Sequence, residues 1–130
     1  MRSALIDTNV LIPFLDGSRD FSDLFSGFDE LVLTSVVIGE FRAGISASQR
    51  GRESTAALAK CLANPLVRVV AVTENTAAYY ARVFQALKAQ GTPIPPNDIW
   101  IAASALEHGM ELVSSDAHFG NVPMLRLIQA

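Results

Sequence analysis

Two short apolar runs near opposite ends of the chain each stop at an aspartate. Ala4-Leu5-Ile6 precedes Asp7, and Leu112-Val113-Ser114-Ser115 precedes Asp116. A short, continuously apolar run is typical of a strand buried on both faces, as in a parallel sheet covered by helices. Ligands of such sheets bind beyond the carboxyl ends of the strands. We therefore expect both aspartates to lie in one functional site, at the carboxyl ends of the strands.

The rest of the sequence alternates between strand-like and helix-like segments. This alternation predicts an α/β fold with a parallel sheet covered on both faces, in a single domain of residues 1–130. The three prolines of TPIPP at 92–96 predict a stiff loop. Strands are expected at 3–7, 30–34, 67–72, 110–115 and near 123–128, and helices at 21–28, 35–45, 53–63, 74–90 and from Asn97 or Asp98 to 108.

Composition leaves the class of partner open. No apolar stretch approaches the roughly 20 residues that span a bilayer, and Asp7 would interrupt a signal peptide, so we expect a cytoplasmic protein without a membrane contact. The single Cys61 predicts no disulfide. The net charge is −3, but if four of the 13 acidic residues bound metal, the ten basic ones would outnumber the others. Nucleic acid is therefore not excluded.

Two further carboxylates lie in apolar surroundings. On a helix, the neighbours of Glu40 three and four residues away are all small or apolar, which favours a partly buried site over a surface Glu paired with Arg42. Asp98 begins a segment that is apolar on nearly all sides. It could instead be a helix cap worth about 1 kcal/mol, although Asn97 is an alternative cap.

Four carboxylates in one pocket require a counter-charge. Two unit charges about 4 Å apart repel by roughly 4 kcal/mol at an effective dielectric near 20. No Lys or Arg lies within three positions of Asp7, Asp98 or Asp116. Oxygen ligands favour Mg²⁺ or Mn²⁺ over zinc, and His108 and His118 lack the paired spacing of a zinc site. For His118 we expect at most an outer-shell or substrate contact.

Four segments contain the four carboxylates, and they are DTNVLI at 7–12, GEFRAG at 39–44, NDIWIAA at 97–103 and SSDAHF at 114–119. In this order they resemble the motifs of PIN-domain ribonucleases, and the resemblance extends over residues 4–127. It is strongest to the VapC toxins of type II toxin–antitoxin systems. It implies a three-layer α/β/α fold with strand order 3-2-1-4-5, which would place the first and fourth strands side by side.

The resemblance also implies an activity, which is hydrolysis of RNA phosphodiester bonds with one or two Mg²⁺ or Mn²⁺ ions. Asp7, Glu40, Asp98 and Asp116 match the acidic quartet that carries catalysis and binds metal in this family. Asp7, Asp98 and Asp116 are the expected direct ligands, while Glu40 is either a ligand or the group that orients water. The residues that match the family's supporting positions are Thr8, Asn9 and Ser114.

The resemblance further implies two protein partners. One is a small VapB-like antitoxin that covers the acidic pocket, and the other is a second copy of the chain. Tyr79, Tyr80 and Phe84 could lie in an interface between copies, although for an amphipathic helix the core of the domain is the favoured place for them. Arg42, Arg50 and Arg52 could contact RNA phosphates or remain solvated.

Several alternatives are weaker or remain open. A receiver-type phosphoacceptor needs a late lysine, but none follows Lys88. A haloacid-dehalogenase-like phosphatase needs DxD after its first strand, where this chain has Asn9, and no G-x-G-x-x-G follows ALID. A housekeeping RNA-processing nuclease and a noncatalytic RNA- or protein-binding module stay open.

Overall fold

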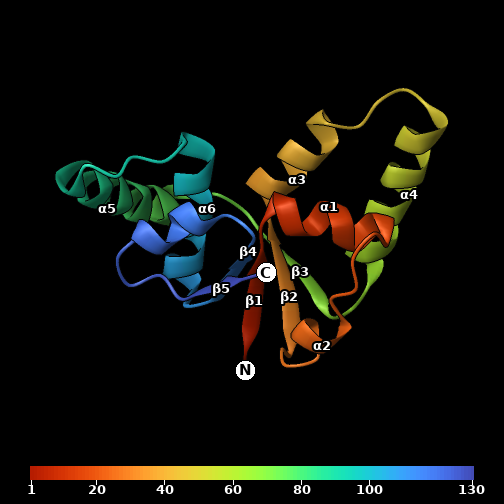
Figure 1. The fold of residues 1–130 in the computed structure, drawn as a ribbon, viewed down its shortest axis with the longest axis horizontal. Coiled ribbons are helices and arrows are strands. Elements are labelled where there is room, and N and C mark those ends of the chain that lie inside the picture. Colours follow the sequence, from red (N-terminus) through yellow and green to blue (C-terminus); the bar gives the residue numbers. More distant parts are fainter.

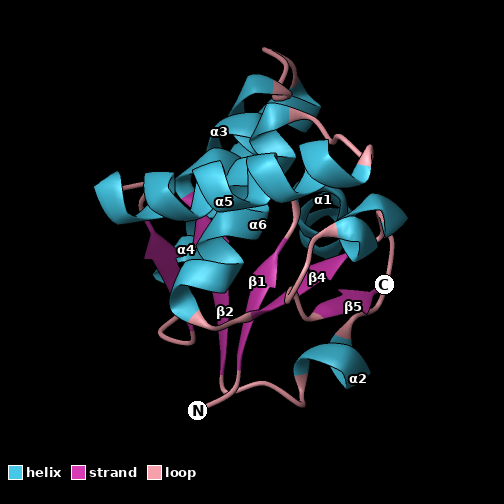
Figure 2. Ribbon diagram, turned by 90° about the vertical axis from the view of Figure 1, so that its left-hand side faces the viewer, coloured by secondary structure: helices cyan, strands magenta, loops and turns pink.

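A computed structural model of the chain describes all 130 residues and contains one five-stranded parallel sheet. The strand order is β3-β2-β1-β4-β5, and Figures 1 and 2 show the strands at the centre of the molecule. This order confirms the predicted topology and explains why the first strand is so apolar, because it lies in the middle of the sheet. The strands are β1 (Ser3–Ile6), β2 (Glu30–Thr34), β3 (Val67–Val70), β4 (Glu111–Ser114) and β5 (Leu127–Gln129).

Helices cover both faces of the sheet and form the outer layers of an α/β/α sandwich. α1 packs against α3 and α4, whereas α5 packs along α6 on the other side (Figure 1). The short α2 lies near the N-terminus, at the opposite end of the strands from α1 and α3 (Figure 1). The helices are α1 (Thr8–Asp16), α2 (Ser22–Phe25), α3 (Ser35–Ala43), α4 (Gln49–Ala63), α5 (Glu74–Gln90) and α6 (Pro96–His108), with a 3-10 helix η1 at Ala117–Asn121.

The core is built on the central strands. Leu5 of β1 is fully buried and pairs in register with Val32 of β2 on one side and Leu112 of β4 on the other. Phe119 of η1 is also fully buried and is among the largest side chains of the core. Continuous apolar strands are thus explained by burial on both faces. No helix combines the length and the apolar character that a membrane span requires.

Several helix ends follow local signals that the sequence contains. Thr34 caps α3, since its hydroxyl accepts a hydrogen bond from the amide of Val37 at 3.0 Å. Gly91 ends α5 with a φ of 73°, in the left-handed region that glycine adopts most readily.

Other boundaries differ from those expected. α1 was not predicted, because Pro13 interrupts its apolar pattern. The short helix nevertheless accommodates this proline, and it ends at Asp16 with Gly17 as its C-cap. α6 begins at Pro96, inside the segment predicted to be loop, since a proline is well tolerated at the first helical position. The segments at 21–28 and 123–128 contain only a one-turn helix and the beginning of a three-residue strand.

Shortening a buried side chain of the central strand β1 should lower the stability of the fold. Leu5→Ala is expected to lower the free energy of unfolding by about 2–5 kcal/mol, because it removes apolar contacts and leaves a cavity between two helical layers. Val69→Ala in the edge strand is the control, since Val69 is 49% exposed and should cost much less. Urea unfolding of both variants measures the difference, and equal losses would contradict this view of the core.

Candidate metal and active site

Asp7 lies where β1 ends and α1 begins. Its backbone amide donates to the carbonyl of Val113 at 3.0 Å, which extends the pairing of β1 with β4 by one residue. Its carboxylate accepts hydrogen bonds from the Thr8 amide at 2.8 Å and the Ser114 hydroxyl at 2.7 Å. The residue is only 4% exposed, and this burial raises the pKa of the Asp7 carboxyl despite both hydrogen bonds.

Glu40 reaches the same edge from α3. The Thr8 hydroxyl donates to Oε1 of Glu40 at 2.8 Å, so the residue after Asp7 fixes the position of a second carboxylate. Glu40 forms no salt bridge with Arg42 or any other basic residue, so the solvated ion pair considered from the sequence is absent. Glu40 also lines a groove of about 680 Å³ between α1, α3 and α4.

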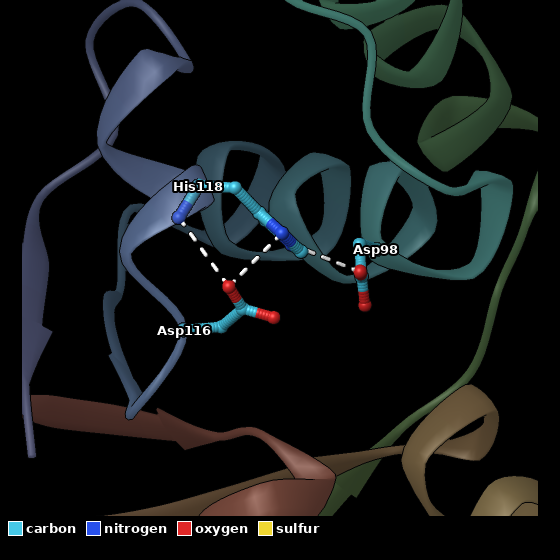
Figure 3. Close-up of side chains that lie close together, drawn as sticks. All are labelled: Asp98, Asp116 and His118. Atoms are coloured by element: carbon cyan, nitrogen blue, oxygen red, sulfur yellow. Dashed lines mark hydrogen bonds and ion pairs between the residues drawn. The ribbon is translucent and has the colours of Figure 1, made fainter.

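Asp98 and Asp116 face each other across the imidazole of His118 (Figure 3). Asp98 lies in the first turn of α6, where it makes no side-chain capping bond, so the cap interpretation of this residue is wrong. Its Oδ2 lies 3.0 Å from Nε2 of His118. Asp116 caps η1, and its Oδ1 lies 3.0 Å from Nδ1 of His118.

Two polar residues connect the ends of β1 and β4. The Ser114 hydroxyl binds Asp7 and also accepts a hydrogen bond from the Asp116 amide at 3.0 Å. The Asn9 carboxamide oxygen accepts a hydrogen bond from the Ser115 amide at 3.1 Å. These bonds hold the two aspartate-bearing turns together.

The four carboxylates influence one another electrostatically. Burial, followed by the charge of Asp7, raises the pKa of Asp98, and His118 lowers it only in part. Glu40 and Asp116 raise the pKa of Asp98 further. No Lys or Arg forms a salt bridge with any of the four, and His118 is the one basic side chain in contact with them. Such a cluster favours binding of a cation.

Three of the side chains are close enough together to hold a metal ion. Asp98, Asp116 and His118 offer ligand atoms that all lie within 4.8 Å of one another. Asp7 and Glu40 are not members of this set, although both are close enough to affect the charge of Asp98. The Nε2 atom of His118 is buried and makes no hydrogen bond. A cation bound at this nitrogen would satisfy it. The residues therefore fit a divalent ion.

The sequence did not predict that His118 lies between Asp98 and Asp116. The available signal was its place two residues after Asp116, directly beyond a buried strand, but that spacing alone does not reveal that Asp98 approaches from α6. Phe119, the next residue, is fully buried and packs beside the imidazole, with ring centroids 4.8 Å apart. Burial of Phe119 thus helps to fix the position of the neighbouring His118 beside the carboxylates.

The chain is similar over most of its length to proteins of one family. The PIN domain family model matches residues 4–125. Ribonuclease VapC4 of Mycobacterium tuberculosis is 27% identical over 98% of this chain and 97% of its own length. Ribonuclease VapC1 of Haemophilus influenzae is 30% identical over 85% of this chain and 84% of its own.

A solved structure of VapBC-1 from nontypeable Haemophilus influenzae is similar as well. Its matching chain superposes with a TM-score of 0.83 at 26% identity, over 98% of this chain and 97% of that one. The family model, the two relatives and the shared fold all cover most of the sequence. The chain therefore belongs to the PIN-domain family, among the VapC ribonucleases.

Proposed function

We propose that this chain is a Mg²⁺- or Mn²⁺-dependent ribonuclease that cleaves RNA phosphodiester bonds, and the toxin of a VapBC-type toxin–antitoxin system. The observation that carries the proposal is the group of four carboxylates at one sheet edge without a Lys or Arg partner, in a chain of the PIN-domain family. We place the activity in the cytoplasm and in a single domain of residues 1–130.

Asp7, Asp98 and Asp116 are the proposed metal-binding residues of this site. A bound divalent ion lowers the pKa of an attacking water and offsets the charge that develops on the phosphate. The Ser114 hydroxyl fixes one oxygen of Asp7, so this carboxylate needs little reorganisation. Glu40 has one oxygen occupied by Thr8 and the other without a hydrogen bond, which suits a residue that binds the ion or orients water.

The partner that restrains the nuclease is proposed to be a VapB-like antitoxin. VapBC-1, the similar solved structure, is named for both components. The groove beside Glu40 offers a surface for a partner segment, since Ile12 on its wall is 48% exposed and Asp16 lies nearby. A segment with one apolar and one basic side chain would match this lining. Arg50, on the same groove, is a candidate contact for RNA phosphate when the antitoxin is absent.

A homodimer is also proposed, with an interface on the outer side of α5 and α6. Phe84 is 46% exposed and stacks on Tyr80, which in turn packs on Trp100 with centroids 4.2 Å apart. Tyr80 is half-buried and packs against the core, so Phe84 is the one large apolar side chain of α5 and α6 that is exposed and available to a second copy.

Loss of one carboxylate should remove activity without unfolding the chain. Asp98→Asn is expected to reduce metal-dependent RNA cleavage by more than about a hundredfold, because even outer-shell partners of a metal site cost 10–100-fold when removed. Asp23→Asn, an exposed carboxylate in α2, is the matched control and should cleave at the wild-type rate. Unchanged turnover in Asp98→Asn would remove Asp98 from the mechanism, and a binding module would show no metal-dependent turnover at all.

Metal should also stabilise the fold. At a Mn²⁺ concentration about 100 times the dissociation constant, the free energy of unfolding should rise by about 2.7 kcal/mol, since only the folded chain brings the ligands together. Urea unfolding with Mn²⁺ and with chelator measures the gain. Asp116→Asn should lose most of it, and an equal gain in that variant would place the ion elsewhere.

The toxin role and the housekeeping role predict different effects of the chain on cell growth. Expression of the chain should arrest growth, and coexpression of a small antitoxin encoded beside it should restore growth. Growth that is unaffected by an enzyme active in vitro would favour the RNA-processing alternative.

A further inference from the structure

His118 is the one imidazole at the acidic edge, and its nitrogen is the one nitrogen in the group of possible metal ligands. Its two ring nitrogens face carboxylates from different elements, Asp98 on α6 and Asp116 before η1, each at 3.0 Å (Figure 3). The three residues form the only group in the structure whose Asp, Glu, His or Cys ligand atoms lie close enough together to hold a metal. The imidazole therefore lies within the candidate metal site.

The two contacts do not amount to a complete hydrogen-bonded bridge. A neutral imidazole has a single N–H, so one of its nitrogens must present a lone pair to a carboxylate oxygen. Nε2 is buried and has no hydrogen-bond partner, although Oδ2 of Asp98 lies only 3.0 Å away. A nitrogen lone pair held 3.0 Å from a carboxylate oxygen is unfavourable, and a cation shared by the nitrogen and the carboxylates would remove that cost.

His118 is also held in place by its neighbours. The adjacent Phe119 is fully buried, and the amide of His118 itself donates to Oδ1 of Asp116 at 3.4 Å. The ring consequently needs no large movement to bind an ion. In protein metal sites, a ligating imidazole typically binds with one nitrogen while the other donates to a carboxylate, and each ring nitrogen here already has a carboxylate beside it.

We propose that His118 is a direct nitrogen ligand of the catalytic ion, together with Asp98 and Asp116, and that it makes the site prefer Mn²⁺ to Mg²⁺. The inference rests on the proposed metal-dependent nuclease function and specifies its metal. Mg²⁺ is a hard ion that favours oxygen ligands, whereas imidazole suits transition metals. A site of oxygen ligands alone would lack this source of selectivity.

Pulsed electron paramagnetic resonance of bound Mn²⁺ tests the ligand directly. The untagged, antitoxin-free chain is loaded with Mn²⁺, and electron spin echo modulation is recorded for the ¹⁴N coupling of a bound imidazole. The chain contains only His108 and His118, so the signal has two possible sources. His118→Ala should lose the coupling, whereas the control His108→Ala, altered at the end of α6, should retain it.

Competition between the two metals tests the selectivity. The wild-type chain should bind Mn²⁺ about tenfold or more tightly than Mg²⁺, and His118→Ala should lose about tenfold in Mn²⁺ affinity while its Mg²⁺ affinity changes much less. Circular dichroism checks that the variant is folded. If it is not, His108→Ala decides the ligand question, because His118 is then the only histidine that can give the coupling.

The outcomes separate this inference from the function on which it rests. Bound Mn²⁺ without imidazole coupling in the wild type, or coupling that persists in His118→Ala, would overturn the role of His118 and leave the nuclease site intact. A chain that binds no Mn²⁺ would overturn both.

Discussion

The parallel pairing of β1 with β4 is the interaction on which the rest of the site depends. These strands come from opposite ends of the chain, and the amide of Asp7 extends their ladder by bonding the carbonyl of Val113. The pairing aligns the turns that follow both strands, so Asp7 and Asp116 emerge at one edge. Ser114 then joins the two aspartates, one through its hydroxyl hydrogen and the other through its oxygen.

The excess of negative charge follows from this alignment. Asp98 arrives from α6 and Glu40 from α3, and no Lys or Arg accompanies them. Burial disfavours the charged forms of Asp7 and Asp98, and the negative charge of the neighbouring carboxylates adds to this effect, so both pKa values are raised. The protein holds these groups with Ser114, Thr8 and the backbone, so the fold stabilises an arrangement that the repulsion between the carboxylates disfavours.

The sequence predicted the sheet better than its surroundings, for physical reasons. Strands buried on both faces are continuously apolar, so β1, β2 and β4 could be recognised without any knowledge of their partners. The strand order came from the family resemblance. α1 was missed because Pro13 interrupts the apolar pattern of a helix that tertiary packing stabilises. The contact of His118 with Asp98 depends on how η1 meets α6, which no local pattern encodes.

Diffraction from crystals containing Mn²⁺, with the anomalous signal of the metal, tests the central claim most directly. The account predicts one or two peaks at the carboxyl edge of β1 and β4, bonded to Asp98 and Asp116 and adjacent to Asp7. Absence of a peak at that edge, with a well-ordered site at saturating Mn²⁺, would contradict the claim that this edge is a metal centre. A peak bonded elsewhere on the chain would contradict it equally.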